Sequence, residues 1–200
     1  MKTKEITVTS RGDGMDEALE MTEALGKRSG LGRKENLRLR LLAEELFGTM
    51  KSIAGDVEGI YYVEKEDTRF DICMKAQVIL TAEMREQFLS VSSTGKNAAA
   101  KSFMGKIRDM ITTVVMSMNS DPTMLQMGIM SAGSPIGYQG GLECYEWYMN
   151  KYKEAVRDSD PEGESEAWDE LEKSIVANLA DDVSISIVRS EVEIKITKTF

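Results

Sequence analysis

The chain has 200 residues, of which 42% are apolar and 30% charged, with only 3 prolines and 16 glycines. This composition fits one globular domain with a sizeable core and excludes a wholly disordered chain or a fibrous repeat. The net charge of −9 repels phosphate backbones and anionic lipid surfaces, which argues against nucleic acid and membranes as partners.

The absence of histidine is the sharpest restriction that the composition imposes. It excludes Ser-His and Cys-His catalytic dyads, His-ligated zinc and phosphorylation on a histidine of this chain. Cys73 and Cys144 match no metal-ligand or redox spacing, so we interpret both as ordinary semi-buried thiols in a reducing compartment. The first ten residues lack the apolar segment of a signal peptide, and a polar interruption divides the apolar stretch 111–130. We therefore expect a cytoplasmic protein.

The first thirty residues are predicted to form a strand and a helix. Residues 4–10 alternate apolar and polar side chains, as a short strand does. The glycines that flank Asp13 then turn the chain into a helix over residues 15–28, and Asp13 is expected to cap its N-terminus.

The next predicted helix, over residues 35–53, is the segment around which the rest of the chain is organised. Its apolar residues recur every third or fourth position, so one face is core, and Gly55 is expected to end it. Glu44 lies nearly opposite that face, whereas Glu45, with Thr49 one turn on, borders it. A carboxylate at the edge of a buried face must be hydrogen-bonded, ion-paired or part of a functional site. The alternative is an ordinary glutamate whose methylene groups pack against the core while its carboxylate lies in water.

A hairpin and two helices are predicted for the middle of the chain. Residues 57–64 and 69–78 alternate as half-buried strands do. A helical stripe predicts a helix over residues 98–118, and an aromatic-rich helix is expected over residues 142–157.

The stretch 117–141 differs in composition from its surroundings, because it is rich in methionine, glycine and serine. We interpret it as a mobile lid or a disordered insertion. One domain is therefore expected over residues 1–200, with a helical, glycine- and methionine-rich insertion or lid at about 92–165.

The last forty residues are predicted to form a charged linker, a helix and a closing hairpin. An apolar stripe predicts the helix over residues 167–180. Residues 183–188 and 192–197 alternate apolar and polar side chains, which predicts an antiparallel hairpin with one exposed face. The order of elements predicts an α+β fold, a two-layer sandwich with helices packed on one face of a mixed, largely antiparallel sheet.

That order, the segment LLAEEL at residues 41–46 and the closing sequence DDVSISIVRSEVEIKITKTF resemble the histidine-kinase-like ATPase (GHKL) superfamily, in the branch of the anti-sigma-factor serine kinases. The resemblance covers the first half of the chain and its last thirty or so residues. The family's helix carries a glutamate followed four residues later by an asparagine that ligates Mg²⁺. Glu45 stands at the glutamate position and Thr49 at the asparagine position. The resemblance implies ATP with Mg²⁺ as cofactor and Glu45 as general base.

Two further nucleotide-binding segments are implied by the resemblance. The family places an aspartate and a glycine after the second hairpin strand, where the aspartate holds the adenine amine. Lys75 and Gln77 stand near those places here, and a lysine cannot accept the adenine hydrogen bonds. The family's glycine-rich lid leads into a helix whose N-terminus faces phosphates, and the loop 93–97 is one alternative for it. The other alternative is formed by Gly137, Gly140 and Gly141.

Three function hypotheses follow. The first is a cytoplasmic regulator that keeps the ATPase fold and binds another regulatory protein, such as a sigma factor or an anti-anti-sigma-like protein, with weak or lost nucleotide binding. This hypothesis is motivated by the degenerate metal and adenine motifs and by the methionine- and aromatic-rich middle part of the chain. The second is an active Mg-ATP-dependent serine kinase or ATPase that uses Glu45. The third is an unrelated α+β interaction domain. A homodimer is compatible with each.

Overall fold

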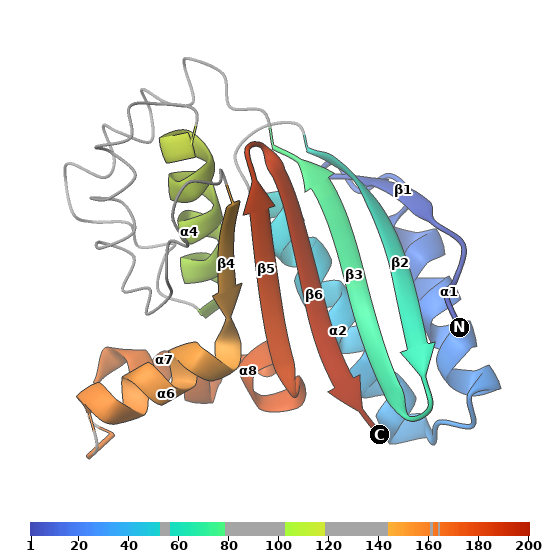
Figure 1. Cartoon of the computed structure of the whole chain (residues 1–200). Coiled ribbons are helices and arrows are strands. Elements are labelled where there is room, and N and C mark those ends of the chain that lie inside the picture. Colours follow the sequence, from blue (N-terminus) through green and yellow to red (C-terminus); the bar gives the residue numbers. More distant parts are fainter. Residues whose placement is uncertain (53–56, 79–102, 119–143, 161, 164) are drawn as a thin grey trace.

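The computed structural model describes all of the chain except residues 53–56, 79–102, 119–143, 161 and 164 (Figure 1). The described helices and strands are, in chain order, β1 (Ile6–Thr9), α1 (Met15–Arg28), α2 (Arg33–Ser52), β2 (Glu58–Glu66), β3 (Arg69–Gln77), α4 (Phe103–Met118), β4 (Cys144–Tyr148), α6 (Met149–Ser159), α7 (Glu166–Lys173), α8 (Ile175–Leu179), β5 (Asp182–Val188) and β6 (Glu191–Thr199).

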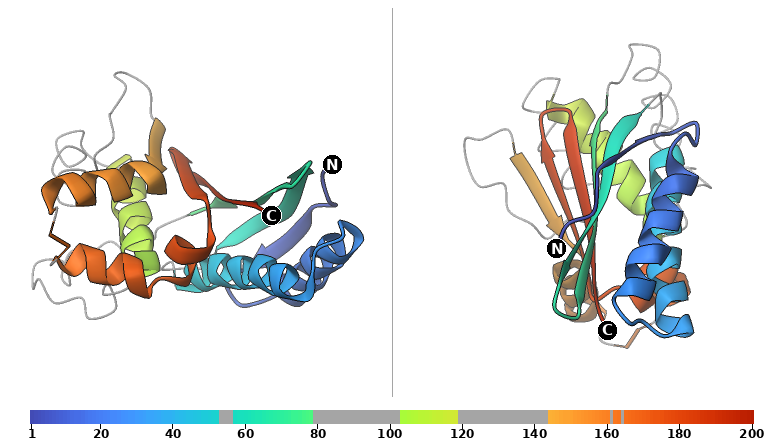
Figure 2. Two further views of the ribbon diagram at one scale, coloured as in Figure 1. Left: turned by 90° about the horizontal axis from the view of Figure 1, so that it is seen from below. Right: turned by 90° about the vertical axis from the view of Figure 1, so that its right-hand side faces the viewer.

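The strands form one six-stranded sheet in the order β1-β2-β3-β6-β5-β4, and each described pairing is antiparallel. Helices α1 and α2 lie along one face of this sheet, and α4 lies beside its β4 end (Figures 1 and 2). The predicted α+β sandwich is confirmed, and the sheet is antiparallel throughout its described part.

One face of the sheet carries the core. Side chains alternate between the two faces of a strand, so the strand register decides which residues share a face. Tyr61, Met74, Ile194, Ile185 and Trp147 are paired across five neighbouring strands and form one buried row. We call the face with this row the inner face and the opposite one the outer face.

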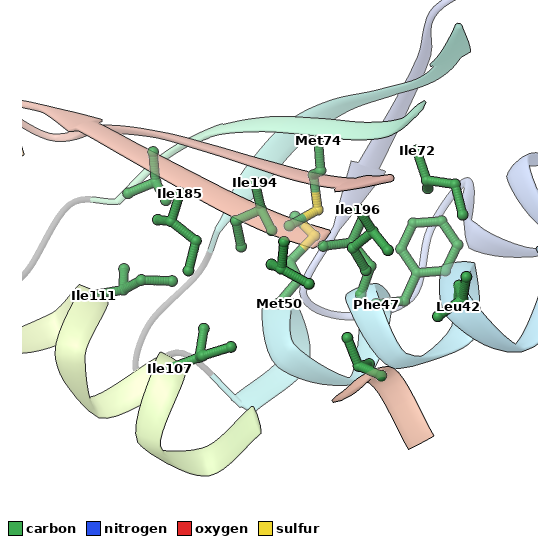
Figure 3. Packing of buried hydrophobic residues seen from close by; sticks show 14 of the residues in the cluster. Leu42, Phe47, Met50, Ile72, Met74, Ile107, Ile111, Ile185, Ile194 and Ile196 are labelled. Atoms are coloured by element: carbon green, nitrogen blue, oxygen red, sulfur yellow. The ribbon is translucent and has the colours of Figure 1, made fainter. Parts of the chain in front are cut away.

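Two helices meet the inner face with apolar side chains. Met50 of α2 points toward Met74 and Ile194, and Ile111 of α4 lies beside Ile185 (Figure 3). All five side chains are almost fully buried. The region between α2, α4 and the sheet is therefore a packed apolar core at these positions.

Helices α1 and α2 contact each other closely through one glycine. A Cβ atom on Gly26 would lie 1.9 Å from Oδ1 of Asn36, whose side chain is buried on α2. Another buried contact joins α1 to the sheet, because the hydroxyls of Thr22 and Tyr61 are 2.6 Å apart. Burial raises the pKa of Tyr61, so this phenol stays protonated and can share its proton with Thr22.

The predicted helix over residues 142–157 is wrong in its first part. Residues 144–148 form β4, which pairs with β5, and only the part from Met149 onward is helical. Tyr145 and Trp147 are buried and Glu146 is exposed, as alternation in a strand requires. Aromatic residues favour strands when a partner strand is present, and that partner lies almost forty residues further along the chain.

Two other predictions also need correction. The predicted helix over residues 167–180 is interrupted at Ser174, whose Oγ accepts a hydrogen bond from Ala177 N at 3.1 Å and caps α8. Asp13 does not cap α1, because Gly14 is the N-cap residue with a left-handed φ of 73°. The Asp13 carboxylate instead accepts a hydrogen bond from Thr9 Oγ1.

The remaining elements lie close to where they were predicted. The helix over residues 15–28 is confirmed as α1, and the hairpins correspond to β2–β3 and β5–β6. Gly55 and most of the expected lid lie outside the described residues. Within the described ranges, no helix combines the length and hydropathy needed to cross a bilayer.

Candidate functional site

Glu45 and Thr49 lie one turn apart on the flank of α2 that faces away from α1. Arg40 and Asn36, which contact α1, point to the other flank because successive residues rotate by about 100° around a helix. Thr49 is buried, and its hydroxyl donates to the backbone carbonyl of Glu45 at 3.1 Å. The structure thus brings this predicted pair together, with the threonine hydroxyl engaged inside its own helix.

The two neighbouring glutamates have different environments. Arg40 Nε donates to the carboxylate of Glu44 at 2.9 Å. Glu45 is half-buried, and its carboxylate has no hydrogen-bond or ion-pair partner in the part of the chain that the structure describes. Burial raises the pKa of Glu45, and the nearby charge of Glu44 raises it further. A carboxylate with a raised pKa is a better proton acceptor than an ordinary surface glutamate.

Lys75 and Gln77 lie on the outer face, on the opposite side of the sheet from α2. Their neighbours Met74 and Ala76 are buried on the inner face. Lys75 pairs across the strands with Glu193, and its Nζ is 3.3 Å from Oε2 of that residue. The structure therefore does not bring these two predicted adenine-binding positions together with Glu45 and Thr49.

The sequence of β3 itself indicates that Lys75 and Gln77 lie on the opposite face of the sheet from Glu45 and Thr49. Ile72, Met74, Ala76 and Val78 are apolar at every second position, and all four are buried. That alternation assigns the intervening residues to the other face. The third predicted group, Gly137, Gly140 and Gly141, lies outside the described residues.

The outer face of the sheet has no α1 or α2 over it (Figure 2). Ile60 and Val188 are exposed there to 41% and 46% of their surface. Tyr62 and Cys73 are paired on β2 and β3, and both are nearly buried, with Lys2 Nζ lying 3.8 Å from the centroid of the Tyr62 ring. This face therefore combines the buried pair Tyr62 and Cys73 with exposed apolar side chains at Ile60 and Val188.

The cysteines are free thiols. Burial raises the pKa of Cys73 to about 12, and the neighbouring carboxylates of Glu64 and Asp71 raise it as well. A thiol with this pKa is protonated at neutral pH and is a poor nucleophile. Cys144 is half-buried, so the interpretation of both residues as ordinary thiols agrees with their surroundings.

Carboxylates outnumber cations on the outer face. The strand register assigns Lys75, Lys195 and Arg69 to it as cations, and Lys2 joins them as the bridge partner of Glu64. The carboxylates that the same register places there are Glu58, Glu64, Glu66, Asp71, Glu146, Asp182, Glu191 and Glu193. A face of this charge is complementary to a basic protein surface and repels polyanions.

No group of three or more histidine, cysteine, aspartate or glutamate side chains in the described ranges is arranged to hold a metal ion. Comparisons of the chain with protein-family models, curated proteins and solved structures found no match.

Proposed function

We propose that this protein is a cytoplasmic regulator that acts by binding another protein, and that its nucleotide binding is weak or lost. The observation that carries the proposal is the position of Lys75 and Gln77 on the outer face, opposite the Glu45–Thr49 pair. A nucleotide cannot contact both groups across a packed sheet. The resemblance to anti-sigma-factor serine kinases makes a sigma factor or an anti-anti-sigma-like protein the expected class of partner.

The environment of Thr49 supports weak nucleotide binding. Its hydroxyl proton is used in the hydrogen bond to the Glu45 carbonyl, and the residue is 3% exposed. Mg²⁺ prefers a site with carboxylate or amide oxygens that leaves room for several water molecules. A buried threonine hydroxyl provides neither a carboxylate or amide oxygen nor room for water molecules.

The outer face supports protein binding. Exposed Ile60 and Val188 lie among an excess of carboxylates. Apolar anchors surrounded by charge are typical of protein–protein interfaces, in which the apolar groups stabilise the complex and the charges select the partner.

Calorimetric titration of the purified chain with ATP and ADP, each with and without Mg²⁺, tests the proposal. We expect no heat of binding up to millimolar nucleotide. Micromolar binding, about −8 kcal/mol, would contradict it. The Thr49→Asn variant is the matched comparison, because a gain of Mg-ATP affinity on restoring an amide ligand would identify a decayed nucleotide site.

A second candidate function is a Mg-ATP-dependent serine kinase or ATPase in which Glu45 is the general base. The half-burial of Glu45, its lack of a partner among the described residues and its raised pKa favour this candidate. If it is correct, Glu45→Gln abolishes ATP turnover while Glu44→Gln leaves most of it. Equal residual rates in the two variants would argue against a catalytic Glu45.

A further inference from the structure

A groove lies between α1 and the residues that precede β1, away from the Glu45–Thr49 pair. It has a volume of about 570 Å³ and lies between the N-terminal residues and α1. Its walls are formed by Met1, Lys2, Thr3 and Lys4 on one side and by Glu17, Glu20, Met21, Ala24 and Arg28 on the other. Every lining residue belongs to the described part of the chain.

On the side of the groove formed by residues 1–4, the backbone groups of Lys2 make no hydrogen bond to any described residue. Met1 O accepts a hydrogen bond from Lys65 N at 2.7 Å, and Thr3 N donates to Val63 O at 2.9 Å. Lys2 lies between these two bonds as the bridge partner of Glu64. In an antiparallel ladder such a residue directs its own N–H and C=O away from the neighbouring strand. The Lys2 backbone groups are therefore oriented toward the edge of the sheet.

The α1 side of the groove carries both acidic and basic side chains. The five lining residues of α1 occupy positions i, i+3, i+4, i+7 and i+11, so they share one helix face. Glu20 and Arg28 are exposed, and neither has an ion-pair partner among the described residues. They are about 12 Å apart along the helix axis, and Met21 and Ala24 lie between them.

This spacing matches an extended peptide. Residues i and i+4 of a strand are about 13 Å apart and point to the same side, as does residue i+2 between them. A strand added antiparallel to Met1–Lys4 would run in the direction of α1, since α1 follows β1 and returns along it. Its basic side chain would then meet Glu20, its apolar side chain Met21 and Ala24, and its acidic side chain Arg28.

We propose that this groove is a β-augmentation site for an extended segment of another protein, in which the side chains facing α1 are basic, apolar and acidic at alternate positions. Main-chain hydrogen bonds to Lys2 supply affinity, and the two charges supply specificity and direction. The inference deepens the proposed protein-binding function and rests on it for its biological meaning.

The ion pair of Lys4 and Glu17 links the N-terminal residues to α1 within the lining of the groove. Edge lysines also protect a sheet against unwanted pairing, and this is the alternative explanation for Lys2 and Lys4. The two explanations differ in what they predict for a peptide of matching charge.

Fluorescence anisotropy with the labelled peptide TKTVTET tests the proposal on the full chain. Its lysine, valine and glutamate stand at alternate positions, and we expect a dissociation constant on the order of 100 µM. The control peptide TETVTET places a glutamate opposite Glu20 and should bind at least about fivefold more weakly.

Two variants separate the backbone contribution from the charge contribution. Lys2→Pro removes the edge N–H, which no β2 residue uses, and should weaken TKTVTET binding about fivefold, whereas Lys2→Ala keeps that N–H and should change it less than about twofold. Arg28→Glu should weaken TKTVTET binding at least about fivefold, and the variant should bind the peptide TKTVTKT about as well as the wild type binds TKTVTET. Arg28 is exposed, so this variant is informative even if Lys2→Pro fails to fold.

Absence of binding at millimolar TKTVTET, or equal affinities in the wild type and the Arg28→Glu variant, would overturn the groove assignment. The nucleotide titration tests the proposed function independently of peptide binding in the groove. Micromolar ATP binding alongside intact peptide binding would remove the proposed loss of nucleotide binding and leave the groove in place.

Discussion

The two faces of the same sheet illustrate two uses of alternating strand residues. On the inner face, Met74 and Ile194 are neighbours in a closed apolar row beneath α2 and α4. On the outer face, one residue further along each strand, Lys75 and Lys195 stand among carboxylates. Adjacent residues of one strand therefore have different roles: those on the inner face stabilise the fold, and those on the outer face are available for binding. The predicted adenine-binding residues belong to the second group.

The largest expected effect is on the inner face. Ile194→Ala removes buried methyl and methylene groups from a packed row, so we expect it to lower the free energy of unfolding by about 2–5 kcal/mol. Lys195→Ala, the adjacent outer-face change, should alter it by less than about 0.5 kcal/mol. Urea denaturation of both variants measures the contrast. Similar losses in the two would mean that the outer face is also covered.

A smaller effect is expected at the two described glycines that lie within α1 and α2. Gly26→Ala should lower the free energy of unfolding by about 1–2 kcal/mol, because the new Cβ would overlap Asn36 Oδ1. Gly48→Ala on α2 should raise it by up to about 1 kcal/mol, since nothing lies within 4 Å and alanine favours a helix. Adding Asn36→Ala to Gly26→Ala should recover part of the loss, which a double-mutant cycle would quantify. An additive cycle would contradict the proposed overlap.

The centre of the outer face should be chemically protected. Cys73 is buried with a pKa raised to about 12, whereas Cys144 is half-buried on β4. At neutral pH, iodoacetamide should alkylate Cys144 at least about tenfold faster than Cys73. Mass spectrometry of Cys73→Ser and Cys144→Ser variants would give the two rates. Faster labelling of Cys73 would show that its thiol is accessible in solution.

The smallest expected effect concerns the pH dependence of stability at Glu45. Burial raises its pKa in the folded state, so the folded protein holds the proton more tightly than the unfolded chain does. This contribution to stability is fully present below the unfolded pKa of about 4.3 and is lost as the pH rises through the folded pKa. Glu45→Gln should therefore stabilise the protein more at pH 7 than at pH 4. Urea midpoints at the two pH values measure the difference, with Glu44→Gln as control.

Local patterns account for the elements that were predicted well. The turn around Gly12 and Gly14 and the helical apolar period place α1 at Met15–Arg28 without help from the rest of the chain. The two hairpins follow from alternation within adjacent residues. Helical geometry alone locates Glu45 as a carboxylate at the margin of a buried face, where the structure also has it.

What the sequence alone determined about this protein is therefore its α+β class, its helix faces and the exclusion of histidine chemistry. Tertiary structure decided the rest, because the deciding contacts join residues far apart in the chain. Residues 144–148 become a strand only through pairing with β5, and the groove beside α1 exists only because Met1–Thr3 pairs with β2. A propensity difference of about 1 kcal/mol within a short segment cannot outweigh such long-range pairing.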